Sequence, residues 1–146
     1  MVTRYFALIY GIAFLLVGIA GFIPGLLTPL EIDVHLAVDG NSGYLLGLFP
    51  VNLLHNLVHV AFGIGGIAAY RTLPSARLYA RVVAIVYAVF AVMGLIPVLS
   101  TTFGFVPLYG HDVWLHALLA IIAAYFGFVR SETAASAKGD AAAQAR

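Results

Sequence analysis

Four long apolar runs, separated by short polar segments, occupy most of this chain of 146 residues. Hydrophobic residues make up 63% of the sequence and charged residues only 9%, with a mean hydropathy of +1.05, whereas soluble proteins average about 25% charged residues. A helix needs about 20 residues to cross the apolar core of a bilayer. The sequence therefore predicts an all-α integral membrane protein, a four-helix transmembrane bundle. The expected spans are residues 5–27, 50–70, 76–97 and 111–129 in one domain over 1–130, and a disordered cytoplasmic tail follows over 131–146.

The composition also excludes several classes of site. The chain has no cysteine, so disulfides, thiolate metal sites, iron–sulfur clusters and a cysteine nucleophile are excluded. A net charge of +1 argues against nucleic acid as a partner. The first apolar run is too long for a signal peptide and no small-residue cleavage site ends it, so it is assigned as the first span. Its glycines lie on one side and are expected to form a packing seam: Gly11, Gly18, Gly21 and Gly25.

The basic residues are divided unevenly among the connecting segments. Lys and Arg occur before the first run, in the turn 71–81 and after the fourth run, whereas the segments 28–46 and 100–110 contain none. The positive-inside rule then places both termini in the cytoplasm. The acidic segment 28–46 is expected to be an outer loop with room for a short strand or helix. All five histidines fall in the outward half: His35, His55, His59, His111 and His116.

Similar sequences occur twice in the chain. Gly-Leu-Phe-Pro (47–50) precedes His55-Asn56, and Gly-Phe-Val-Pro (104–107) precedes His111-Asp112. The first and third runs also end alike, in Gly-Phe-Ile-Pro (21–24) and Gly-Leu-Ile-Pro (94–97). These matches predict two parallel helical-hairpin repeats related by an axis near the membrane normal. Such symmetry would turn equivalent faces of the second and fourth helices towards each other.

Polar side chains gather on those two helices. At about 100° per residue, one narrow helix face carries Asn52, His55, Asn56 and His59. Asp112 and His116 share a face of the fourth helix, with His111 at the rim. Polar groups in a membrane segment face the bundle interior or a cavity and are candidates for a functional site.

Two kinds of cofactor suit this set. His55, His59, His116 and Asp112 offer three imidazoles and a carboxylate, which suit zinc, iron or copper. In that reading Asn52 and Asn56 are hydrogen-bond partners that fix the imidazole tautomers. The other cofactor is a haem b held by one histidine from each helix.

A structural explanation competes with the cofactor. Buried histidine and asparagine also join membrane helices by hydrogen bonds, at ~0.6 kcal/mol each, so the cluster can equally be an interhelical clasp that packs helices or recruits a partner. A small-molecule or proton pathway is a third interpretation. The residues do not decide between a metal- or haem-dependent enzyme and a binding protein. The partners expected are bilayer lipid and the metal or haem, with a homo-oligomer left open.

The chain resembles a bacterial family of small four-helix membrane proteins that carry a domain of unknown function. The similarity rests on 47–59, on Ala-Phe-Gly-Ile-Gly-Gly (61–66), on Thr-Phe-Gly-Phe-Val-Pro-Leu-Tyr-Gly-His-Asp (102–112) and on His116. The resemblance implies a bacterial inner-membrane protein and brings no activity with it.

Overall fold

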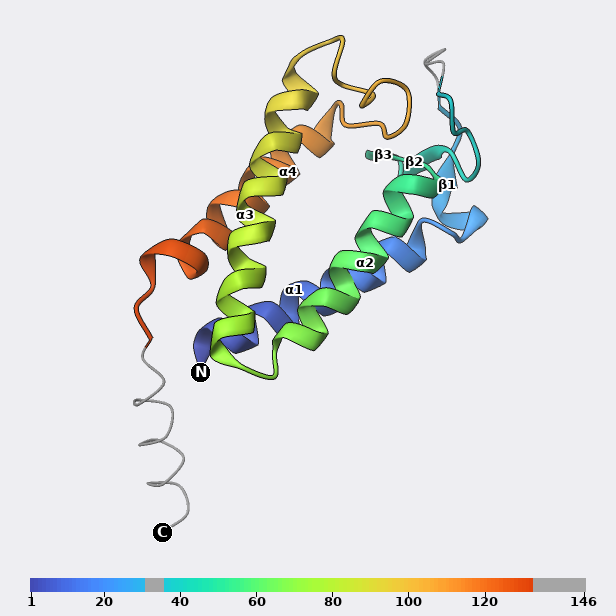
Figure 1. Ribbon diagram of the computed structural model, residues 1–146. Coiled ribbons are helices and arrows are strands. Elements are labelled where there is room, and N and C mark those ends of the chain that lie inside the picture. The colour runs from blue at the N-terminus through green and yellow to red at the C-terminus, as the bar shows by residue number, and fades with distance from the viewer. Residues whose placement is uncertain (31–35, 133–146) are drawn as a thin grey trace.

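The computed structural model describes residues 1–30 and 36–132, and within these ranges the chain is mostly helical (Figure 1). The helices are α1 (Val2–Ala20), α2 (Leu53–Ala69), α3 (Leu73–Leu95) and α4 (His111–Ala124), and α4 continues into a π-helical turn, η2 (Tyr125–Val129). A 3₁₀ turn, η1 (Pro24–Leu26), and three short strands complete the elements: β1 (Leu27–Thr28), β2 (Gly43–Leu45) and β3 (Phe49–Val51). The predicted all-α class is confirmed. Residues 133–146 of the expected tail, and His35, lie outside the described residues.

The helices form two hairpins, α1 with α2 and α3 with α4, and α3 also packs against α1 and α2 (Figure 1). The core between the hairpins combines aromatic rings with small residues that allow close helix approach: Phe6, Ala7, Phe14, Ala69, Ala76, Tyr79, Ala80, Val83, Ala84, Tyr87, Ala120 and Ala123. Large aliphatic side chains such as Ile9, Leu16, Ile85 and Ile121 point outward instead. This reversal of the soluble pattern is what a lipid solvent requires.

Three helices are long and apolar enough to cross a membrane: Val2–Ala20, Leu73–Leu95 and His111–Val129. The chain is therefore a membrane protein by length and composition. The fourth helix, α2, has 17 residues and extends about 26 Å, somewhat less than an apolar core of about 30 Å. The sequence predicted that this helix begins near Pro50, but it begins at Leu53. Pro50 lies in β3, and the Asn52 side chain caps the helix.

The segment between α1 and α2 folds into a small antiparallel sheet in the order β1-β2-β3. Pro50 sits in the edge strand β3, where a residue without an N–H is tolerated. α1 ends at Ala20, earlier than the expected residue 27, and the buried amide of Asn56 donates a hydrogen bond to the carbonyl of Gly21, its C-cap (2.9 Å). The expected outer loop is thus partly ordered as strands.

The glycine seam on α1 is confirmed at three of its four positions. At Gly11, for example, an added Cβ would lie 2.6 Å from the backbone nitrogen of Ile67 in α2. At Gly18 an added Cβ would lie 2.9 Å from the Asn56 carbonyl oxygen, and at Gly21 it would clash with the Asn56 side chain. Gly25 lies in η1 with no atom within 4 Å of an added Cβ, so its assignment to the seam was wrong. The α1–α2 hairpin is therefore held by direct backbone contact.

The arginine end of the molecule, which we define by Arg4, Arg71, Arg77, Arg81 and Arg130, holds the start of α1, the α2–α3 turn and the end of η2. Glu132 joins these parts: its carboxylate accepts hydrogen bonds from the Thr3 N–H (3.1 Å) and from Arg130 Nε (2.7 Å). Partial burial opposes ionisation of this carboxyl, but the hydrogen bonds from the Met1 amino group, Arg130 and Thr3 outweigh it and lower the pKa of Glu132 to about 2. The start of α1 and the chain after η2 are thus joined at the arginine end.

Equivalent places in the two hairpins make similar contacts. The dipeptides 46–47 and 103–104 both have positive φ angles, and each precedes by three residues a buried proline, Pro50 or Pro107. At the arginine end, Arg4 Nε donates to the Tyr70 carbonyl (2.7 Å) and Arg81 Nε donates to the Gly127 carbonyl (2.8 Å). Both acceptors lie twenty residues after their proline. The duplication of the hairpins stays a prediction, and these paired contacts support it.

Candidate metal centre

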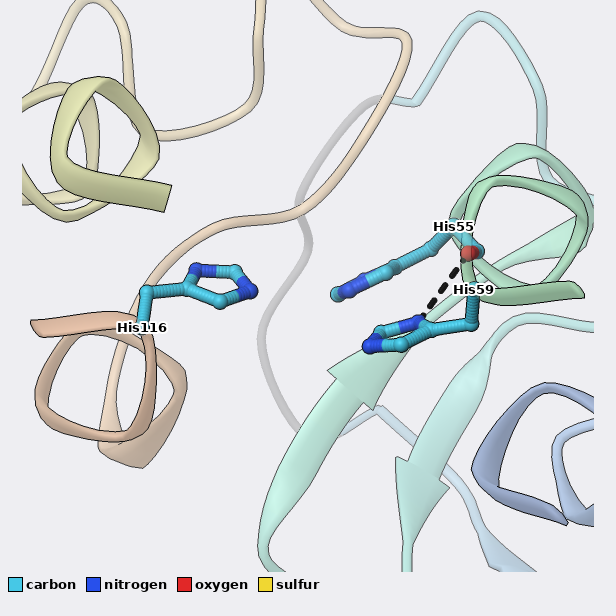
Figure 2. A group of neighbouring side chains, drawn as sticks. All are labelled: His55, His59 and His116. Atoms are coloured by element: carbon cyan, nitrogen blue, oxygen red, sulfur yellow. Dashed lines mark hydrogen bonds between the residues drawn. The ribbon is translucent and has the colours of Figure 1, made fainter. Parts of the chain in front are cut away.

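Three buried histidines lie together at the histidine end, which we define as the starts of α2 and α4 with the segments 21–30, 36–52 and 96–110 that cover them. His55, His59 and His116 each offer a ring nitrogen, and these nitrogens all lie within 4.8 Å of one another. The exposed fractions of the three residues are 3%, 6% and 2%. Figure 2 shows the ring of His116 directed towards the rings of His55 and His59 across the space between α4 and α2. The predicted approach of the two helices' imidazoles is therefore present.

The two imidazoles of α2 lie one above the other. His55 and His59 are stacked, with ring centroids 4.7 Å apart and planes inclined by 17°. The ring nitrogen Nδ1 of His59 lies 3.2 Å from the carbonyl oxygen of His55, drawn as a dashed line in Figure 2. A carbonyl only accepts, so this contact assigns the His59 proton to Nδ1 and leaves Nε2 with a free lone pair.

Asp112 lies behind His116 and not among the converging nitrogens. Its Oδ2 is 3.4 Å from Nδ1 of His116, one helical turn along α4. The contact is within ion-pair range but is not aligned as a hydrogen bond, and both atoms are buried without a hydrogen-bond partner in the described structure. Of the residues proposed from the sequence as metal ligands, the three histidines come together and Asp112 stands in a second layer.

Asn52 connects the covering segments to the start of α2. Its Oδ1 accepts from the His55 N–H (2.9 Å), and its Nδ2 donates to the carbonyls of Val38 (2.9 Å) and Phe105 (2.7 Å). Asn56 donates to Gly21. Both amides therefore bond to backbone, whereas the sequence suggested that they bond to imidazoles. His111 is exposed at the first position of α4, in keeping with its expected place at the rim.

Aromatic rings surround the three histidines. The Tyr87 ring meets His116 edge-on at 4.9 Å and 85°, and Phe90 lies 5.7 Å from the same imidazole. Phe14 lies 5.7 Å from His59. The sequence did not point to these residues of α3 and α1 because aromatic side chains in an apolar helix carry no distinctive spacing.

A sharper spacing signal was present in the sequence. Counted from Pro50 and Pro107, a histidine follows nine residues later in both cases, His59 and His116. Five residues after the same prolines stand His55 and Asp112. In the predicted repeat these positions correspond, with a carboxylate in the second half where the first half has an imidazole.

Comparison with known proteins gives one match. Neither a curated protein nor a solved structure is similar to this sequence. A family model described as a domain of unknown function (DUF4383) matches residues 4–129, which include all four helices from the fourth residue onward and every residue of the cluster. The family resemblance noted in the sequence is thereby confirmed, and the chain belongs to the DUF4383 family.

Proposed function

We propose that this protein binds one transition-metal ion through His55, His59 and His116. The observation that carries the proposal is the convergence of three buried imidazole nitrogens within 4.8 Å. Nitrogens bound to a common tetrahedral zinc are about 3.3 Å apart. Small side-chain rotations, of about 1 Å at each nitrogen, would therefore close the set around an ion.

The contacts favour an ion over the interhelical clasp. A clasp would satisfy its polar groups by hydrogen bonds, because an unpaired buried polar atom costs about 1–3 kcal/mol. Here Nδ1 of His55 is buried without such a bond, whereas Nδ1 of His116 and Oδ2 of Asp112 face each other at 3.4 Å. The two asparagines, in contrast, make the clasp contacts already.

The same geometry disfavours haem b. A macrocycle must lie between its two axial imidazoles, and His59 stands beside His55 where that plane would pass. The two cavities that border the cluster have volumes of about 50 and 100 Å³. Pockets for drug-sized ligands begin near 300 Å³, so neither cavity accommodates a tetrapyrrole.

We assign the remaining polar groups to the support of the ligands. The His55 carbonyl holds the proton of His59 on Nδ1, and Asp112 faces Nδ1 of His116. In both cases Nε2 is left for the metal, the arrangement that outer carboxylates and carbonyls impose on ligating histidines. The carboxylate also offsets the partial positive charge of the two helix amino termini, which would otherwise oppose a cation. Asp112 is thus a positioning residue in this proposal.

We also propose that the site lies in the outer half of a bacterial inner membrane. All described Lys and Arg side chains lie at the arginine end, opposite the histidine end. The positive-inside rule puts that end, with both termini, in the cytoplasm. The metal would then be exchanged with the extracytoplasmic side.

Metal uptake by purified protein tests the proposal. The protein in mild detergent is incubated separately with Zn(II), Co(II) and Cu(I), freed of unbound metal by gel filtration, and assayed for metal per chain. We expect about one ion per chain from at least one metal. His55→Ala, His59→Ala and His116→Ala should each lose the ion. The matched control is His111→Ala, which removes an exposed imidazole from the same end and should retain it.

A second measurement keeps the test independent of mutant folding. X-ray absorption of the metal-loaded wild type should show three imidazole nitrogens around the ion. The bound ion should also raise the melting temperature of the wild type and leave that of His116→Ala unchanged, because only a bound ligand shifts the folding equilibrium. Wild-type protein that refuses all three metals, or a stoichiometry that survives the three substitutions, would overturn the proposal in favour of the clasp.

A further inference from the structure

One cavity touches all three imidazoles. It has a volume of about 50 Å³ and borders His55, His59 and His116. Its other walls come from α2, α3 and the 96–110 segment: Val58, Tyr87, Phe90, Thr102, Val106 and Leu108. The neighbouring cavity of about 100 Å³ reaches His55, His59 and Asp112 but not His116. Only the smaller of these two is therefore positioned to serve an ion held by all three nitrogens.

The size of the cavity limits what it holds. A water molecule needs about 10–15 Å³ of such volume, so about 50 Å³ exceeds what a metal ion alone would fill. It is far below the 300 Å³ or so at which pockets for drug-sized ligands begin. The space suits an ion together with a ligand of two or three atoms. Three protein ligands also leave a fourth tetrahedral position for such a ligand.

The walls of the cavity select against charge and against water. None of the residues that border it is Asp, Glu, Lys or Arg. The Thr102 hydroxyl is already used, because it donates to the Val106 carbonyl at 3.0 Å. A buried water typically makes about three hydrogen bonds, and besides the imidazoles the wall side chains offer only the hydroxyls of Tyr87 and Thr102. A neutral, weakly polar molecule fits these walls better.

The cavity lies near the surface of the transmembrane region. Val58, Phe90 and Val106 are only partly buried, so a ligand has a short path from the space between α2, α3 and the 96–110 segment. Small neutral gases partition into the apolar part of a bilayer, which surrounds α2 and α3 in the proposed orientation.

We propose that the ion held by His55, His59 and His116 binds a neutral diatomic molecule, of the class of dioxygen, carbon monoxide and nitric oxide, at its fourth coordination position within this cavity. The inference rests on the proposed metal site. It adds the class of ligand and the wall residues that admit it.

Carbon monoxide and Cu(I) provide the test, since Cu(I) bound by three imidazoles leaves one position for carbon monoxide. Protein loaded with Cu(I) under anaerobic conditions is titrated with carbon monoxide and followed by infrared spectroscopy. We expect a single narrow C–O stretching band that is absent from metal-free protein. Val58→Phe and Val106→Phe fill the cavity and should weaken carbon monoxide binding by at least about tenfold, because the added ring occupies the space that the ligand needs. Copper per chain should stay unchanged in both.

The control lies in the same covering segment. Val98 is 72% exposed, so Val98→Phe adds the same ring outside the cavity and should leave copper and carbon monoxide binding as in the wild type. Copper bound without a C–O band, or a band insensitive to both filling substitutions, overturns the diatomic site and leaves the metal site standing. Failure to take up Cu(I) overturns the diatomic site as well. If the protein also fails to bind Zn(II) and Co(II), the proposed metal site is overturned as well.

Discussion

His116 differs from the two imidazoles of α2 in having a carboxylate behind it. His59 is oriented by a main-chain carbonyl, which no substitution of a side chain removes. In the proposed site Asp112, whose Oδ2 lies 3.4 Å from Nδ1 of His116, would orient His116 in the same way. A buried aspartate in a membrane span is costly unless it is used. Its role can therefore be examined one atom at a time, by keeping its shape and removing its charge.

We expect Asp112→Asn to lower the affinity for Zn(II) by about 10- to 100-fold while three imidazoles remain bound to the metal, the usual result of changing the partner of a ligating histidine. Competition with a chromophoric chelator measures the affinity, and X-ray absorption counts the ligands. His111→Gln serves as the control and should bind Zn(II) like the wild type. Loss of an oxygen ligand on substitution would instead return Asp112 to the coordination sphere, and an unchanged affinity would leave it without a part in binding.

At the scale of the helices, the two hairpins close in related ways at the histidine end. Gly21 and Gly94 each stand three residues before a proline, Pro24 or Pro97. An added Cβ on Gly21 would clash with the side chain of Asn56. On Gly94 it would clash with the Leu108 carbonyl and meet Val113 Cγ2 at 2.6 Å. Asn56 lies six residues after Pro50, and Val113 lies six residues after Pro107, so the contacts are equivalent.

Alanine at either glycine tests this packing. Gly94→Ala would gain helix propensity, yet we expect it to destabilise the protein by about 1–3 kcal/mol, because the new methyl group forces the 96–110 segment away from α3. Gly21→Ala should act in the same direction by displacing the amide of Asn56. Thermal unfolding in detergent measures both changes.

Two glycines provide controls for that series. Gly25 has no atom within 4 Å of an added Cβ, and Gly65 has its nearest such atom at 3.8 Å, so Gly25→Ala and Gly65→Ala should be neutral or slightly stabilising. If Gly94→Ala matched them, the segment that carries Leu108 would not be closed onto α3. A destabilisation at only one of Gly21 and Gly94 would count against the repeat.

The sequence allowed the helices to be predicted better than their ends. Long apolar runs indicate spans because burial in lipid depends on composition alone. The start of α2 was placed three residues early, since the strand that contains Pro50 exists only through pairing with β2. The imidazole cluster was predicted from spacing, but the use of Asn52 and Asn56 was not. Amides satisfy whichever backbone group the fold brings near, and Val38, Phe105 and Gly21 are distant in the chain.

Over the whole molecule, charge and chemistry are separated along the membrane normal in the proposed orientation. The described arginines lie at one end, where Glu132 links Thr3 and Arg130, and the histidine cluster lies at the other. In the proposed orientation the site lies in the outer half and would exchange metal with the outside and not with the cytoplasm. The side of the membrane from which metal reaches the site therefore depends on the orientation of the protein.

The absence of native cysteine makes the orientation directly measurable, since each introduced thiol is the only one in the chain. Asp39 and Ser131 are both exposed and belong to opposite ends. In spheroplasts, which have lost the outer membrane but keep an intact inner membrane, Asp39→Cys should react with a membrane-impermeant maleimide. Ser131→Cys should react only after the membrane is permeabilised, because the arginine end is retained in the cytoplasm. The reverse pattern would put the histidines on the cytoplasmic side and make cytoplasmic metal the source for the site, and labelling of both thiols in spheroplasts would show insertion in two orientations.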